Sequence, residues 1–143
     1  MTEKTQLTLE QVLDAKEARA ARQRDLLAQY GGSLASITVN LPGPHKNRPE
    51  AVELVRYAVC TLAELFEASF QEVQELPTGP VGFVCCLAPA EVLKRAAVAI
   101  EETSTFGRLL DVDVFNSEGK LLTRGEQAEN KRRCFLCDQP AII

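Results

Sequence analysis

Two aspartates that alternate with apolar residues are the strongest candidates for chemistry in this sequence. Asp111 and Asp113 lie in the segment G-R-L-L-D-V-D-V-F at residues 107–115. Because side chains alternate along a β-strand, both carboxylates would project from one face, with α-carbons about 7 Å apart. Such a pair can bind one or two Mg²⁺ ions, which would bridge polyphosphate oxygens and stabilise a pyrophosphate leaving group. The alternative, which the spacing alone favours, is an amphipathic strand with a solvated acidic face.

A basic stripe on the first predicted helix is the second candidate. Lys16, Arg19 and Gln23 are spaced three and four residues apart and therefore line one side of a helix, and Arg22 overlaps that side. The stripe would neutralise a triphosphate, and arginine suits this task because its planar fork contacts phosphate oxygens with two hydrogen bonds. A merely solvated helix face is the alternative, because acidic neighbours weaken the local field.

The loop at residues 41–47 is a third candidate, because it joins a predicted strand to the start of a predicted helix. Backbone amides at a helix N-terminus attract phosphate, Gly43 lies within the loop, and Lys46 adds a positive charge. We expect an anion to dock here, although the G-x-x-x-x-G-K spacing of a P-loop is missing. A connector stiffened by proline is the alternative. His45 is the only histidine, and a histidine without a paired nucleophile is weak evidence for acid–base catalysis.

Cys134 and Cys137 form a single C-x-x-C motif. The pair would supply two thiolates to zinc, whereas structural zinc sites generally need four ligands. The motif does not stand at the start of a helix that follows a strand, where a thioredoxin-like motif would lie. We interpret these residues as two reduced thiols, with a partial zinc site or a redox pair as the alternatives.

The overall composition limits the classes of protein to consider. The chain has 143 residues, 45% of them hydrophobic, and a net charge of −4. This suits one compact domain, and it indicates neither a disordered polyanion nor a globally basic nucleic-acid-binding protein. No apolar run approaches the roughly 20 residues that span a bilayer, and the start of the chain lacks a secretory signal. Five cysteines, with Cys85 and Cys86 adjacent, favour free thiols in a reducing compartment. We therefore expect a cytoplasmic protein that binds neither nucleic acid nor membrane.

The hydrophobic pattern predicts the elements that position these residues. Thr8 and Gln11 form a capping box at the start of a helix over residues 9–30, and Gly31 and Gly32 end it. Further helices begin near residues 47 and 89, and strands are predicted at 34–39, 70–76, 81–87, 109–115 and 120–123. After the first helix this is the split βαβ order of ferredoxin-like α+β folds, with one added strand. We expect a single domain, divided into an N-terminal helix at 1–32, an α+β core at 33–125 and a C-x-x-C tail at 126–143.

Four ordered segments resemble one protein family, the apo-citrate lyase phosphoribosyl-dephospho-CoA transferases, also called citrate lyase holo-acyl-carrier-protein synthases. The segments are R-A-A-R-Q at 19–23, S-I-T-V-N-L-P-G-P-H-K at 36–46, G-R-L-L-D-V-D-V at 107–114 and R-R-C-F-L-C at 132–137. They have the order and spacing of the family and extend over nearly the whole chain, so together they are far more specific than any one of them.

The resemblance implies a nucleotidyl-type transfer. A serine hydroxyl of the citrate lyase acyl carrier subunit would attack triphosphoribosyl-dephospho-CoA and release pyrophosphate, so the nucleophile would lie in the partner. Asp111 and Asp113 match the family's acidic pair and would bind Mg²⁺. The other matching residues would contact the donor or act in catalysis, and they are Arg19, Arg22, Gln23, Gly43, Lys46, Gly107 and Arg108. A module that binds an acyl carrier protein or a CoA-like ligand without turnover is the competing hypothesis.

The segment at 107–114 has a second, shorter resemblance, and the C-terminal end differs from the family pattern. The segment at 107–114 also resembles the metal-binding strand of hydroxymethyl-dihydropterin pyrophosphokinases, which have a ferredoxin-like core and hold magnesium-ATP with paired aspartates. That likeness is an analogy that agrees with the predicted fold. Family members similar to this chain continue after the C-x-x-C motif with another cysteine and a histidine, whereas this sequence ends at Ile143.

Overall fold

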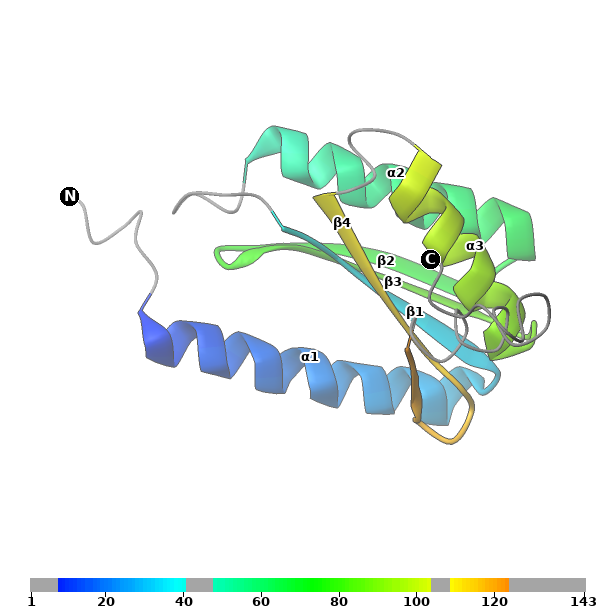
Figure 1. Ribbon diagram of the computed structural model, residues 1–143. Coiled ribbons are helices and arrows are strands. Elements are labelled where there is room, and N and C mark those ends of the chain that lie inside the picture. The colour runs from blue at the N-terminus through cyan, green and yellow to red at the C-terminus, as the bar shows by residue number, and fades with distance from the viewer. Residues whose placement is uncertain (1–7, 41–47, 104–108, 124–143) are drawn as a thin grey trace, which may run out of the picture.

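The computed structural model describes residues 8–40, 48–103 and 109–123. These residues form an α+β fold in which three helices cover one five-stranded sheet (Figure 1). In chain order the elements are α1 (Leu9–Tyr30), β1 (Ser33–Val39), α2 (Pro49–Phe66), β2 (Phe70–Leu76), β3 (Gly79–Cys86), α3 (Ala90–Thr103), β4 (Leu110–Phe115) and β5 (Leu121–Leu122). In this described part of the chain, no helix combines the length and apolar character that crossing a membrane requires.

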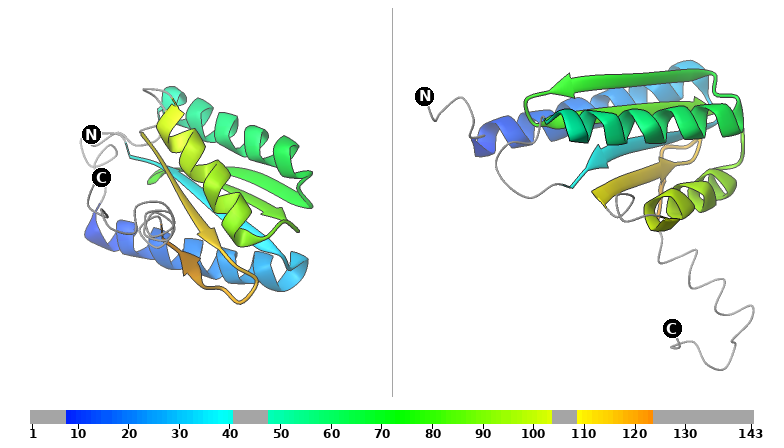
Figure 2. Two further views of the ribbon diagram at one scale, coloured as in Figure 1. Left: turned by 45° about the vertical axis from the view of Figure 1, so that its right-hand side comes forward. Right: turned by 90° about the horizontal axis from the view of Figure 1, so that it is seen from above.

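The sheet confirms the predicted ferredoxin-like arrangement. Its strand order is β2-β3-β1-β4-β5, and every neighbouring pair is antiparallel. The crossover helices α2 and α3 cover one face, and α1 lies alone on the opposite face (Figures 1 and 2). Because β1 is the central strand, any side chain that it presents toward α1 lies between residues of β3 and residues of β4.

The first helix begins and ends where the sequence predicts. The hydroxyl of Thr8 accepts a hydrogen bond from the Gln11 amide at 3.0 Å, and the Gln11 side chain accepts one from the Thr8 amide at 2.9 Å. This capping box satisfies two backbone donors that a helix start leaves unpaired. At the other end, Gly31 has φ +69°, and its amide donates to the Leu27 carbonyl at 2.9 Å.

The larger hydrophobic core lies between the sheet and the helices α2 and α3. It contains Val55, Val59 and Leu62 from α2, as well as Leu93 and Ile100 from α3. All of β3 is buried. The helix α2 approaches β3 so closely at Gly82 that an added Cβ would lie 2.4 Å from a methyl group of Val59. This packing makes the sheet a rigid support for the residues on its other face.

A smaller core joins α1 to the opposite face of the sheet. Leu26 is the one buried residue of α1, and it packs in a cluster with Leu34, Val81, Phe83 and Cys85. The N-terminal half of α1 therefore lies over the sheet without a buried anchor of its own.

Several predicted strand boundaries differ from the structure by one or two residues. The turn expected at residues 77–80 is shorter, because Gly79 and Pro80 already belong to β3, and Pro80 lies opposite Glu75 of β2. The final strand is also shorter than expected and comprises Leu121 and Leu122. In each case the end of the strand depends on pairing with the neighbouring strand, which a local sequence pattern does not reveal.

Candidate functional site

The two aspartates of β4 share one face of the sheet, as their spacing predicts. Leu110, Val112 and Val114 are buried in the core beneath α2 and α3. Asp111 is exposed and Asp113 is half-buried, and both belong to the alternate face, which α1 covers. The acidic pair therefore lies on the same side of the sheet as the basic helix.

Asp113 lies in an environment that disfavours its negative charge. Burial raises the pKa of Asp113 above its ordinary value, and the charges of Asp111 and Glu101 raise it further. The positive charges of Lys94 and Arg19 act in the opposite direction. A divalent cation shared by the two aspartates would relieve their mutual repulsion, because a nearby positive charge favours ionised carboxylates.

The ligand set around the aspartates suits a cation that is bound together with a substrate. Within residues 8–40, 48–103 and 109–123, no group of three or more His, Cys, Asp and Glu side chains is placed to hold a metal ion. Mg²⁺ usually takes one or two carboxylates and completes its shell with water and substrate phosphates. Two aspartates therefore fit Mg²⁺ with a phosphate-bearing ligand, whereas they do not fit a closed site made only of protein side chains.

The register of β1 against β4 connects the acidic pair to the basic helix. Ser36 lies opposite Asp113, and Thr38 lies opposite Asp111. The amide group of Gln23 donates a 3.0 Å hydrogen bond to the hydroxyl of Ser36. Gln23 thus fastens α1 over the strand position next to Asp113.

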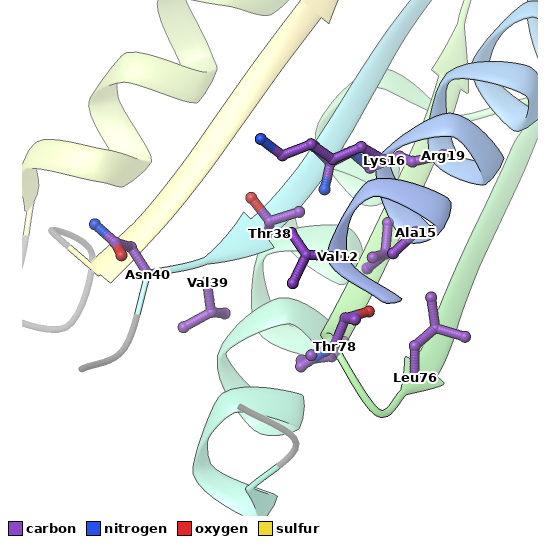
Figure 3. A pocket seen from close by; sticks show the side chains of 12 residues that line it. Val12, Ala15, Lys16, Arg19, Thr38, Val39, Asn40, Leu76 and Thr78 are labelled. Carbon is purple, nitrogen blue, oxygen red and sulfur yellow. The ribbon is translucent and has the colours of Figure 1, made fainter. Parts of the chain in front are cut away.

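A pocket of about 410 Å³ opens between the N-terminal half of α1 and the sheet (Figure 3). Its walls are formed by Val12, Ala15, Lys16, Arg19, Thr38, Val39, Asn40, Leu76, Thr78, Gly79, Pro80 and Val81. Figure 3 shows Lys16 and Arg19 extending from α1 toward Thr38. Thr38 is also the register partner of Asp111, so the pocket borders the strand position of that aspartate, although neither Asp111 nor Asp113 is among its lining residues. A cavity of this volume, mostly apolar with a few polar groups, is typical of small-molecule sites.

Comparison with known proteins identifies the family of the chain. Residues 7–143 match the family model described as apo-citrate lyase phosphoribosyl-dephospho-CoA transferase. The chain belongs to this family. Proteins of that name in Escherichia coli O157:H7 and Shigella sonnei are 32% identical to the chain over 142 residues, which is 96% of this chain and 78% of each relative. A protein from Shigella boydii serotype 18 with the same name matches to the same extent.

One basic residue of this transferase is not brought to the acidic pair. The guanidinium of Arg22 donates to both carboxylate oxygens of Glu72, at 3.1 and 3.3 Å, and lies 5.7 Å from the centre of the Phe70 ring. Glu72 and Phe70 belong to β2, which is separated from β4 by β3 and β1. The structure therefore gives Arg22 a partner within the protein and places it toward the opposite edge of the sheet.

Several predicted site residues of the transferase lie outside the described residues. They are Gly43, Lys46, Gly107, Arg108, Cys134 and Cys137, and His45 lies there as well. The residues that flank two of these segments are close to one another, because the Asn40 amide donates a 2.7 Å hydrogen bond to the Leu109 carbonyl. The chain therefore enters segment 41–47 and leaves segment 104–108 at neighbouring points, at the end of the sheet where Asn40 lines the pocket.

Sequence reasoning missed two polar residues that contact the acidic strand. Lys94 and Glu101 of α3 both hydrogen bond to the backbone of Val112, which lies between the two aspartates. The signal was present in the sequence, because residues 94 and 101 are two turns apart and adjoin Leu93 and Ile100 on the inner stripe of α3. Charged residues at such positions require partners in the core.

Proposed function

We propose that this transferase attaches phosphoribosyl-dephospho-CoA to a serine of the citrate lyase acyl carrier subunit, with triphosphoribosyl-dephospho-CoA as donor and Mg²⁺ held by Asp111 and Asp113. The observation that carries the proposal is one shared face of the sheet. On that face two carboxylates adjoin a pocket lined by Lys16 and Arg19. This is the charge arrangement that a metal-bound polyphosphate requires, with anionic metal ligands on one side and cations on the other.

The pocket has two kinds of wall, and each suits a part of the donor. Leu76, Pro80 and Val81 provide an apolar wall for the uncharged rings of a nucleotide-like molecule, while Lys16 and Arg19 extend over the opposite wall. The half-buried position of Arg19 strengthens its attraction for phosphate, because a partly desolvated charge is screened less by water. We expect the donor's phosphates to lie between Arg19 and the aspartates.

The proposed reaction is a substitution at phosphorus. The serine oxygen of the carrier forms a bond to the phosphorus nearest the ribose, the bond from that phosphorus to the bridging oxygen breaks, and pyrophosphate leaves with that oxygen. The serine proton is released. When bound, Mg²⁺ would neutralise charge on the phosphate oxygens and the leaving group. Asp111 and Asp113 would hold that cation, and Arg19 and Lys16 would orient the donor so that the hydroxyl approaches in line.

A transfer assay with a matched pair of variants tests the proposal. The carrier subunit, the donor and Mg²⁺ are incubated with the enzyme, and mass spectrometry measures the mass gained by the carrier while pyrophosphate is quantified. Asp111→Asn should lower the transfer rate on the order of 100-fold or more, because it removes a charge that acts on the reacting phosphates. Asp25→Asn makes the same change at an exposed position of α1 and serves as the control. An unchanged rate in Asp111→Asn would show that the aspartate does not act in the reaction.

A further inference from the structure

We infer that Lys94 and Glu101 of α3 are positioning residues that clamp the backbone of β4 between the two aspartates and set the direction of both carboxylates. This inference rests on the proposed role of Asp111 and Asp113 as metal ligands. Lys94 and Glu101 themselves would touch neither the cation nor the donor. They would act through Val112.

Both hydrogen bonds of the clamp end on one residue. The ammonium group of Lys94 donates to the Val112 carbonyl at 3.3 Å, and the Val112 amide donates to Oε2 of Glu101 at 2.7 Å. Lys94 and Glu101 are seven residues apart in α3, so they present their side chains on the same side of the helix, two turns from each other. One side chain thus satisfies the acceptor of Val112 and the other satisfies its donor.

The topology of the sheet explains why side chains are needed at this point. In an antiparallel pair, alternate residues direct their amide and carbonyl groups away from the neighbouring strand. Val112 lies opposite Ile37 of β1, and its amide is bonded to Glu101 rather than to β1. On the other side of β4, the short strand β5 pairs with Val114 and Phe115 only. Among residues 8–40, 48–103 and 109–123, the edge at Val112 is therefore completed by α3 and not by a strand.

The burial of Lys94 argues that the clamp does more than cover a strand edge. Lys94 is 5% exposed, and the transfer of a lysine charge from water into a protein interior is strongly unfavourable unless the charge is compensated. Strand edges are commonly protected by short strands, prolines or exposed charges, none of which requires a buried ammonium group. The ammonium group is instead held at the carbonyl of Val112, whose chain neighbours are the two aspartates.

The position of Val112 explains how the clamp would affect both aspartates. Asp111 and Asp113 are its immediate chain neighbours, so a rotation of the peptide groups on either side of Val112 redirects one or both carboxylates. Hydrogen bonds made to metal-ligating side chains typically change metal affinity by about 10–100-fold when they are lost. The two bonds at Val112 would restrict the carboxylates in the same way, through the backbone.

Direct measurement of Mn²⁺ binding tests the inference without relying on turnover. Mn²⁺ is a suitable probe because it prefers the same oxygen ligands as Mg²⁺, and the signal of free Mn²⁺ in electron paramagnetic resonance reports its binding. Lys94→Met and Glu101→Met should each weaken Mn²⁺ binding by about 10-fold or more. Glu101→Gln retains an acceptor for the Val112 amide and should recover most of the lost affinity. Arg95→Met and Glu91→Met, at exposed positions of the same helix, should bind Mn²⁺ as the unmodified chain does.

The same titration separates a failure of the clamp from a failure of the proposed metal site. Suppose that Asp111→Asn weakens Mn²⁺ binding but Lys94→Met and Glu101→Met only lower the thermal stability. Lys94 and Glu101 then only protect the edge of β4, and the inference is wrong. If Asp111→Asn leaves Mn²⁺ binding unchanged, or the unmodified chain binds none even with pyrophosphate present to complete the shell of the cation, the aspartates are not the metal ligands. Should the methionine variants fail to fold, Lys94→Gln replaces them, because its shorter side chain draws the donor away from the Val112 carbonyl. Unaltered Mn²⁺ affinity in that variant would overturn the inference.

Discussion

Leu26 anchors α1 to the sheet, and its replacement by alanine should loosen the helix that carries Lys16 and Arg19. Its side chain is 1% exposed and is the one fully buried side chain of this helix. The other described ties between α1 and the sheet are weaker. Leu27 and Tyr30 are only partly buried against the same cluster, where Tyr30 stacks on Phe70 of β2 with ring centres 5.0 Å apart. Gln23 donates one hydrogen bond to Ser36, and a single neutral hydrogen bond stabilises a fold by only about 1 kcal/mol.

The magnitude of the effect follows from the burial of the side chain. Replacing a buried leucine by alanine costs about 2–5 kcal/mol, because apolar area is lost and a cavity remains. We expect about 3 kcal/mol for Leu26→Ala, in the lower half of that range, because α1 covers its face of the sheet alone and can settle toward the cavity. With an unfolding entropy of about 2.1 cal/mol/K per residue, this change lowers the Tm of a chain of this length by about 10 °C. The variant should remain folded at 25 °C, since domains have free energies of unfolding of about 5–15 kcal/mol.

Urea unfolding and donor kinetics measure the two consequences. The free energy of unfolding of Leu26→Ala is compared with that of Leu13→Ala, which makes the same change on the same helix where the side chain is 50% exposed. The control should change the free energy by less than about 0.5 kcal/mol. The KM for the donor should rise in Leu26→Ala, because a loosened helix no longer holds Lys16 and Arg19 over the pocket. Equal stability of the two variants would refute the role of Leu26 as the anchor.

Two further predictions concern charge. In EDTA, Asp113→Asn should stabilise the protein at pH 7, because the folded-state pKa of Asp113 is raised and its ionisation therefore opposes folding. The contribution of Asp113 to stability is lost as pH rises from the ordinary pKa of 3.8 through the folded-state value. The thermal melts of the two proteins should therefore converge below pH 3.8, and a gap that widened there would contradict the argument. Arg19→Met should raise the donor KM by about 10-fold or more, since hydrogen bonds to charged groups contribute about 1.5–3 kcal/mol. Compared with Arg19→Met, Arg22→Met should raise the donor KM less and lower the Tm more, because Arg22 is bonded to Glu72. Steady-state kinetics that gave both variants the same donor KM would show that both arginines act in donor binding.

Local sequence patterns determined the elements of this fold because their causes are local. The capping box of Thr8 and Gln11 and the glycine at residue 31 act over three or four residues, and the structure places the ends of α1 at those signals. The common face of Asp111 and Asp113 follows in the same way from the two-residue period of a strand. The order of elements predicted a ferredoxin-like sheet, because crossover connections of this kind permit few topologies, whereas the pairing of the strands came from the structure.

The sequence by itself therefore determined the helices and strands, their order and the common face of the two aspartates. Only the tertiary structure decided which face α1 covers, how Arg22 reaches a glutamate 50 residues away, and how Lys94 and Glu101 meet at Val112. The physical reason is that the helical period determines which residues lie on one face of a helix, but not which strand that face packs against. That choice depends on packing between distant segments, which no local pattern contains.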